Sequence, residues 1–320
     1  MADAVVPNRI GVLGATSLVG ACLLPLLTEA GWQVTAFSRR VVGELGDKVE
    51  WRQLPLAECS SLQPSYKTTS HPARRPKDGS QVPGYPQGGE GVISHWICVT
   101  PIWVLPDYFG LFDAQGVRRL VVLSSTSRFT KNDSTDPEEQ SIALRLVDAE
   151  ARVREWAESR GVEWVILRPT LIYGLGRDKN IAEIARFIRR FNFFPLFGKA
   201  TGLRQPIHAM DVAGACLAAF QAPCAANRAY NISGGETLTY RDMVARVFSV
   251  LDCRLRLLTV PLWAFRLAVA MLRHLPRYRQ WSTAMAERMN RDLVFDHAEA
   301  ARDLGFKPRA FMLAAGDLPA

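Results

Sequence analysis

The sequence predicts an α/β fold in which a doubly wound parallel sheet is followed by a smaller C-terminal α/β part. Short apolar runs alternate with longer helical ones through the first half of the chain, and a glycine-rich turn joins the first pair. The alternation loses its regularity after residue 170. Strands separated by helices of this length are typical of βαβ units, whose parallel strands share one sheet.

The elements of the first half follow from these runs in order. The expected strands are residues 9–13, 32–38, 49–54, 95–100, 119–125 and 163–168. The expected helices are residues 18–30, 104–115 and 138–159. Pro25 lies inside the first helix, where a proline costs about 3 kcal/mol and is expected to cause a kink.

One segment interrupts this alternation. Residues 60–91 are rich in Pro, Gly and Ser and show no apolar period. Structureless loops longer than about 15 residues are uncommon in compact domains, so we expect a disordered surface insertion. Its basic residues fit a solvated linker or a basic recognition tail, and the linker is favoured; these residues are Lys67, Arg74, Arg75 and Lys77.

The second half predicts a smaller α/β subdomain. We expect helices and short strands at residues 181–191, 205–208, 210–221, 229–232 and 240–251. The chain is therefore divided into residues 1–170 and residues 171–320. Segments of the second part near residues 205–250 are expected to return to the main sheet.

The composition excludes several classes of protein. With 320 residues, 48% of them hydrophobic, the chain is not wholly disordered, collagen-like or a disulfide-stapled miniprotein. The net charge of +8 favours anionic partners: phosphorylated cofactors, nucleotide sugars, nucleic acid or an acidic membrane surface. Its 6 cysteines show no zinc-site spacing, so reduced thiols and no metal are expected. Without a secretion signal or a long apolar run, we expect a cytoplasmic protein.

The most specific motif is the turn GVLGATSLVG at residues 11–20, between the first strand and the first helix. Gly14 permits a tight turn, and small residues after it let backbone N–H groups approach a pyrophosphate at the helix N-terminus. Gly20 lets the helix pack closely on the sheet. A tight turn without a ligand is the alternative. The cofactor-binding residues expected here are Gly14, Ala15, Thr16, Ser17, Leu18, Val19 and Gly20.

The end of the second strand bears on the choice of cofactor. NAD-selective sites place a carboxylate there for the ribose 2′-hydroxyl, whereas this chain has Ser38 followed by Arg39 and Arg40. A pair of guanidinium groups suits the 2′-phosphate of NADP. The pattern favours NADP(H) over NAD(H), and a solvated basic turn is the alternative.

The turn resembles the G-x-x-G-x-x-G motif of the short-chain dehydrogenase/reductase superfamily, extended or atypical branch, with Ser17 at the middle glycine. Five later segments are similar to nucleotide-sugar epimerases in the family's order: VVLSSTSRF, LRPTLIYG, QPIHAMDVAGA, YNISGGETLTY and LVFDHAEAARDLGFKPR. The resemblance implies a Rossmann fold, a nicotinamide cofactor and a nucleotide-sugar or other phosphorylated substrate.

The resemblance also implies roles for single residues. Thr126 stands at the family's active-site hydroxyl and Tyr173 near the nicotinamide, so both are candidates for catalysis. His208 is a further titratable candidate on a loop. The cofactor set is extended by Thr100, Ser124, Arg168 and Pro169.

The sequence departs from the family on the helix after the fifth strand. Members that oxidise or reduce a carbonyl use Tyr-x-x-x-Lys there, and with Glu150 as the family's later glutamate these positions hold Ile142 and Leu146. Neither can move a proton. An apolar packing face is expected instead, and Glu150 is expected to pair with Arg154. That face comprises Ile142, Leu146, Ala149, Val153 and Trp156.

The sequence leaves three functions open. The first is an NADP-dependent oxidoreductase or epimerase with non-standard acid–base residues, for which Arg186, Arg189, Arg190 and Arg204 are candidate diphosphate ligands. The second is a non-catalytic redox sensor or accessory subunit, favoured by the missing dyad. The third and least favoured is contact with a membrane surface or nucleic acid, suggested by the charge and by the amphipathic pattern of residues 262–279. Nothing in the sequence indicates an oligomeric state.

Overall fold

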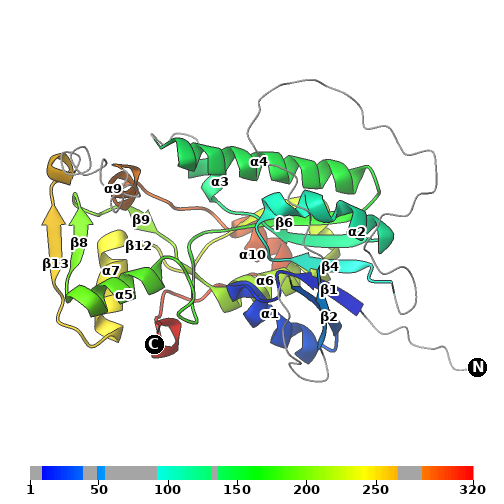
Figure 1. Ribbon diagram of the computed structural model, residues 1–320, viewed down its shortest axis with the longest axis horizontal. Helices are drawn as coiled ribbons and strands as arrows, with labels where there is room; N and C mark the ends of the chain where they lie inside the picture. The colour runs from blue at the N-terminus through cyan, green and yellow to red at the C-terminus, as the bar shows by residue number, and fades with distance from the viewer. Residues whose placement is uncertain (1–8, 39–48, 55–91, 131–135, 266–282, 320) are drawn as a thin grey trace, which may run out of the picture.

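The computed structural model describes most of the chain, with its ends and several internal segments left out (Figure 1). The described residues are 9–38, 49–54, 92–130, 136–265 and 283–319. The expected insertion at residues 60–91 lies outside them. So do Arg39 and Arg40.

A seven-stranded parallel sheet forms the centre of the molecule, with the strand order β11-β6-β5-β4-β1-β2-β3. Its strands are β1 (Arg9–Leu13), β2 (Gln33–Ser38), β3 (Val49–Gln53), β4 (His95–Cys98), β5 (Arg119–Leu123), β6 (Glu163–Pro169) and β11 (Arg228–Ile232). The order reverses direction at β1, as it does in doubly wound dinucleotide-binding sheets. The predicted fold class is therefore confirmed.

Helices cover both faces of this sheet (Figure 1). One apolar core lies under α1 (Leu18–Glu29) and α6 (Ala209–Gln221). The other lies under α4 (Pro137–Glu158) and α2 (Phe109–Ala114). On β5, Val121 faces the first core, whereas Leu120 and Val122 face the second. Both faces are buried, which explains why these strands read as continuous apolar runs.

One predicted helix is present only in part. Residues 104–115 were expected to form a single helix, but the structure has a 3-10 helix, η1 (Ile102–Tyr108), followed by the short α2. Pro106 lies inside η1, and a proline cannot donate the backbone hydrogen bond that an α-helix requires. No helix in the described ranges is both long and apolar enough to cross a membrane.

The C-terminal part surrounds a third core at one end of the sheet, on the left in Figure 1. Its helices are α5 (Ile181–Phe191), α7 (Tyr240–Val250) and α9 (Thr283–Asn290). A further helix, α10 (Ala298–Leu304), packs on the first core, beside β11 and α6. Its paired strands are β7 (Ile172–Tyr173) with β10 (Ile207–His208), β8 (Phe194–Phe197) with β13 (Leu257–Val260), and β9 (Leu203–Arg204) with β12 (Leu238–Thr239). α6 and β11 lie instead at the main sheet.

Candidate functional site: two adjoining clefts

Two clefts meet at the carboxyl ends of the main strands, where doubly wound sheets bind their ligands. The smaller, of about 470 Å³, is lined by the start of α1, residues 99–103 after β4, and residues 177–179. The larger, of about 1060 Å³, extends between the sheet and the C-terminal part. The residues that line both are Ser125, Ser127, Ile172 and Lys179. The two clefts therefore adjoin at these four residues.

The β1–α1 turn has the shape of an anion site. Gly14 has a φ of +88°, and a Cβ atom there would lie 2.8 Å from the backbone nitrogen of Thr100. A Cβ atom on Gly20 would lie 2.5 Å from the Ala15 carbonyl oxygen. Ser17 caps α1, since its Oγ accepts a hydrogen bond from the Gly20 N–H at 3.0 Å. The close packing around both glycines and the cap at the start of α1 fit a bound pyrophosphate.

The predicted cofactor residues that the structure describes divide into three groups. Those that line the smaller cleft are Ser17, Leu18, Val19, Thr100, Ser124 and Pro169. Those that shape the turn are Gly14, Ala15, Thr16 and Gly20. Ser38 is buried at the end of β2, and Arg168 lines neither cleft. Their contact with a cofactor stays a prediction.

Three charged residues of the loop after β7 were missed in the sequence. Arg177, Asp178 and Lys179 all line the smaller cleft. The Arg177 Nη2 donates to the Thr16 carbonyl oxygen at 2.9 Å, so this loop is tied to the β1–α1 turn. The available signal was their position shortly after the Arg-Pro-x-x-x-Tyr-Gly segment, which ends at Gly174. These residues lie far from the β1–α1 turn in the sequence, so no local pattern indicates the contact between Arg177 and Thr16.

Asp178 has one satisfied and one unsatisfied carboxylate oxygen. Its Oδ1 accepts from the backbone N–H groups of Asn180, at 2.8 Å, and Ala182, at 3.2 Å, and so caps the start of α5. Its Oδ2 is buried and has no hydrogen-bond partner within the part of the chain that the structure describes. Buried polar atoms are rarely left unpaired, so this oxygen marks a place for a donor from a ligand.

The two helix positions that the sequence analysis aligned with the dyad line the smaller cleft. Ile142 and Leu146 both line it from α4, and Leu146 is 3% exposed. Asp136 caps this helix by accepting from the Glu138 N–H at 2.9 Å. This part of the cleft wall is thus hydrocarbon. The predicted apolar face of this helix is confirmed by the burial of its other members, Ala149, Val153 and Trp156.

A buried charge network stands one turn further along α4. Glu150 is 1% exposed and accepts from the Ser124 hydroxyl at 2.5 Å and from Arg168 Nη2 at 2.7 Å. Arg128 also donates to it. Burial lowers the pKa of both arginines, and for Arg128 the Arg168 charge adds to the effect. The expected Glu150–Arg154 pair was wrong because Glu150 points at the sheet, whereas Arg154 lies over the Trp164 ring.

The two catalytic candidates occupy different surroundings. Thr126 lines the larger cleft, but its hydroxyl and its backbone N–H both donate to the Pro169 carbonyl oxygen at 3.1 Å. Tyr173 lines neither cleft. It is fully buried against His208 and Phe311, and burial raises the pKa of its hydroxyl to about 12. Neither hydroxyl is placed to give a proton to a ligand.

His208 is a structural residue. Its Nδ1 accepts from the Met210 N–H at 3.1 Å, so Nε2 carries the hydrogen and donates to Asp317 Oδ1 at 3.0 Å. Both side chains are buried, and neither lines a cleft. This bond ties the C-terminal end of the chain to the start of α6.

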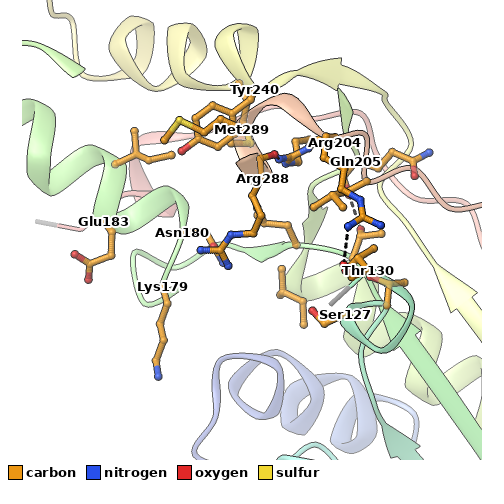
Figure 2. Close-up of a pocket in the computed structure, with 18 of the residues that line it drawn as sticks. Ser127, Thr130, Lys179, Asn180, Glu183, Arg204, Gln205, Tyr240, Arg288 and Met289 are labelled. Atoms are coloured by element: carbon orange, nitrogen blue, oxygen red, sulfur yellow. Dashed lines mark hydrogen bonds between the residues drawn. The ribbon is translucent and has the colours of Figure 1, made fainter. Parts of the chain in front are cut away.

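The larger cleft has an excess of positive charge (Figure 2). Its basic residues are Lys179, Arg186, Arg190, Arg204, Arg288 and Arg291, against the acids Glu139, Glu183 and Glu287. Glu139 is 2.6 Å from Arg288, and Glu183 is 2.6 Å from Arg186. A phosphorylated ligand is the kind of molecule that such a surface attracts.

Two of the four predicted diphosphate ligands have structural roles. Arg204 is 4% exposed and donates to three backbone carbonyl oxygens, of Leu203, Arg291 and Arg288. Burial lowers the pKa of this guanidinium to about 10. Arg189 lies outside both clefts and donates to the Pro319 carbonyl oxygen. The expectation that these two meet a diphosphate is therefore not supported.

Comparison with known proteins agrees with this geometry. Residues 109–233 match the model of the NAD dependent epimerase/dehydratase family. The resemblance to nucleotide-sugar epimerases is confirmed. UDP-glucose 4-epimerase of Vibrio cholerae is 24% identical over 203 residues, which cover 60% of this chain and 59% of that protein. The Bacillus cereus UDP-glucuronic acid 4-epimerase in complex with NAD has the same fold, with a TM-score of 0.64, 12% identity, and coverage of 97% and 95% of the two chains.

Another relative is named as a subunit rather than as an epimerase. NADH dehydrogenase [ubiquinone] 1 alpha subcomplex subunit 9 of Arabidopsis thaliana is 26% identical over 108 residues. The match covers 33% of this chain and 27% of that protein. The chain thus spans less than two thirds of the length of these two curated relatives.

Proposed function

We propose that this protein binds a nicotinamide dinucleotide in the smaller cleft and a nucleotide sugar or another phosphorylated ligand in the larger one. The anion-binding turn and the unpaired Asp178 oxygen support the first assignment. The surplus of basic residues in the larger cleft supports the second. The UDP-glucuronic acid 4-epimerase of the same fold is a complex with NAD, and a relative in sequence is a UDP-glucose 4-epimerase.

We infer that the cofactor is NADP(H). Ser38 ends β2 where NAD-selective sites carry a carboxylate, and Arg39 and Arg40 follow it in the sequence. Titration of the tryptophan fluorescence with both reduced cofactors tests this. NADPH is expected to bind at least tenfold more tightly than NADH, by about 1.4 kcal/mol. Equal affinities would contradict the proposal.

The hydrocarbon wall at Ile142 and Leu146 limits the chemistry that a bound cofactor can perform. A bound nicotinamide supplies a hydride donor or acceptor, but carbonyl chemistry also needs a proton at the substrate oxygen. Ser125 and Ser127 line both clefts and can hydrogen-bond that oxygen, yet a hydroxyl is a weak acid at neutral pH. The geometry therefore supports a cofactor-bound protein without dehydrogenase turnover, acting as a redox sensor or accessory subunit.

An oxidoreductase or epimerase is the second candidate. One observation favours it: Lys179 lines both clefts and so stands where a substrate oxygen and a nicotinamide would meet. Its ammonium group could supply the substrate proton that Ile142 and Leu146 cannot supply. The same position also suits a purely binding role.

Turnover measurements separate the two candidates. The wild-type chain, with NAD⁺ or NADP⁺ and a panel of UDP-sugars, is expected to bind ligands without changing the absorbance at 340 nm or the sugar. The double variant Ile142→Tyr, Leu146→Lys is expected to gain turnover, because it restores the proton donor and the cation. Turnover by the wild type would establish the second candidate. If the wild type and the double variant both bind the cofactor but neither binds a UDP-sugar, the nucleotide-sugar assignment is contradicted.

A further inference from the structure

We propose that Asp178 and Lys179 bind the ribose hydroxyl groups at the nicotinamide end of the cofactor, from the wall opposite the missing dyad. This inference rests on the proposed binding of a dinucleotide in the smaller cleft. It concerns a pair of residues whose position in the sequence carries no dinucleotide-binding motif.

The walls of the smaller cleft differ in polarity. On one side, α4 presents Ile142 and Leu146, which offer no hydrogen bond. On the other, the loop after β7 presents charged side chains, and Arg177 anchors this loop to Thr16 in the phosphate-binding turn. A cofactor whose phosphates lie at the start of α1 would therefore find its polar partners on the loop.

The unpaired oxygen of Asp178 can accept a hydrogen bond from a ligand. The side chain is only 6% exposed, and its other oxygen is already bound by two backbone N–H groups. A buried carboxylate oxygen without a hydrogen bond is costly. A phosphate would be repelled by this charge, whereas a sugar hydroxyl donates to a carboxylate, as the ribose does in NAD-selective sites.

Lys179 completes the site with a cation. It is exposed and has no ion pair or hydrogen bond with another of the described residues. Figure 2 shows its side chain pointing away from Glu183 and toward the blue-shaded helix α1. An ammonium group there can donate to a hydroxyl oxygen of the same ribose. A carboxylate acceptor and an ammonium donor for one diol thus come from two consecutive residues that line the same cleft.

Truncated cofactors test the assignment by binding alone. Calorimetry compares ADP, which lacks the second ribose, with ADP-ribose, which has it, and with the complete reduced cofactor. The variants are Asp178→Asn, which keeps an oxygen to cap α5, and Lys179→Met. The matched controls are Asp148→Asn, an exposed acid on α4, and Lys307→Met, an exposed lysine outside both clefts.

Each variant is expected to weaken ADP-ribose and the complete cofactor about tenfold, the effect of one charge-assisted hydrogen bond, while ADP and both controls stay within twofold of wild type. Equal weakening of all three ligands would overturn the proposal in favour of a role in folding or at the phosphates. A loss confined to the complete cofactor would assign the pair to the nicotinamide instead. If the wild type binds none of the three, the proposed function itself fails; if it binds them and both variants are unchanged, only this inference fails.

Discussion

At the scale of single residues, Glu150 organises the carboxyl end of the main sheet. Its buried carboxylate joins Ser124 after β5, Arg128 in the next short helix and Arg168 at the end of β6. Three chain segments that line or border the clefts therefore depend on one charge. A charge buried without compensation is strongly unfavourable, so removing one partner of this network should measurably lower the free energy of unfolding.

Glu150→Ala is expected to reduce the free energy of unfolding by about 3 kcal/mol, because two partly buried guanidinium groups lose their counter-ion. Urea unfolding at pH 7 measures this. Asp148→Ala on the same helix is the control, since that side chain is 70% exposed and its loss should stay within about 0.5 kcal/mol. Similar values for the two variants would show that the network contributes little.

At the scale of elements, the β1–α1 turn combines two demands on glycine. Gly14 adopts a left-handed φ, and its missing Cβ also makes room for the backbone of Thr100. Gly31, at the other end of α1, has a similar φ of +84° but no atom within 4 Å of a built Cβ. A comparison of substitutions at Gly14 and Gly31 therefore separates the cost of the left-handed backbone conformation from the cost of close packing.

Gly31→Ala is expected to cost about 1 kcal/mol of stability from the left-handed conformation alone. Gly14→Ala should cost more, about 2–4 kcal/mol, and should also abolish binding of ADP because the turn must move away from β4. Thermal melting and calorimetry with ADP measure both effects. Intact ADP binding by the Gly14 variant would contradict the assignment of this turn to the pyrophosphate.

His95, at the start of β4, gives the sheet a dependence on pH. Its ring lies 5.4 Å from that of Phe220 and 6.3 Å from that of Trp32. Burial, and then the charges of Arg119 and Arg118, lower its pKa from 6.5. As the pH falls, His95 is therefore protonated at a higher pH in the unfolded chain than in the folded one.

This group is expected to make no difference to stability well above pH 6.5 and to reduce it as the pH falls below that value. His95→Gln removes the titration, so the wild type should lose more stability than the variant between pH 7.5 and 5.5. Urea midpoints at several pH values in this window test the difference. Parallel curves for the two proteins would show that the pKa is not lowered.

At the scale of the whole molecule, the C-terminal residues close the third core. Leu318 is buried in it, and Asp317 bonds His208 at the start of α6. The same segment packs on Gly176, where a Cβ would lie 2.7 Å from the Leu318 carbonyl. The loop that carries Arg177, Asp178 and Lys179 is therefore held in place by residues that come last in the chain.

Asp317→Ala is expected to cost about 1–3 kcal/mol, because it leaves the buried His208 N–H without an acceptor. Asp317→Asn keeps an acceptor oxygen for His208, but its amide group replaces the Oδ2 atom that accepts from the Ala314 N–H at 3.0 Å, so this variant should recover only part of the loss. Urea unfolding compares the two variants with wild type. If the alanine variant is as stable as the asparagine variant, the contact does not hold the chain end.

The fold and part of the candidate site were predictable from local patterns. Apolar runs between helical ones predicted the strands of the main sheet, since burial on both faces requires an unbroken apolar strand. The glycine turn, the apolar residues at Ile142 and Leu146, and their common helix face were also visible, because each depends on spacing within one element. η1 was missed because Pro106 favours a local hydrogen-bond pattern that apolar periodicity does not encode.

The sequence by itself determined the parallel sheet, the glycine turn between β1 and α1, and the apolar positions Ile142 and Leu146 on α4, since these depend on residues close together in the chain. Only the tertiary structure decided the partners of charged groups. Glu150 pairs with Arg168 instead of Arg154, Arg204 donates to backbone carbonyl oxygens, and Asp178 lines the smaller cleft. Long side chains can reach many partners, and the choice among them is made by burial, which brings distant segments together.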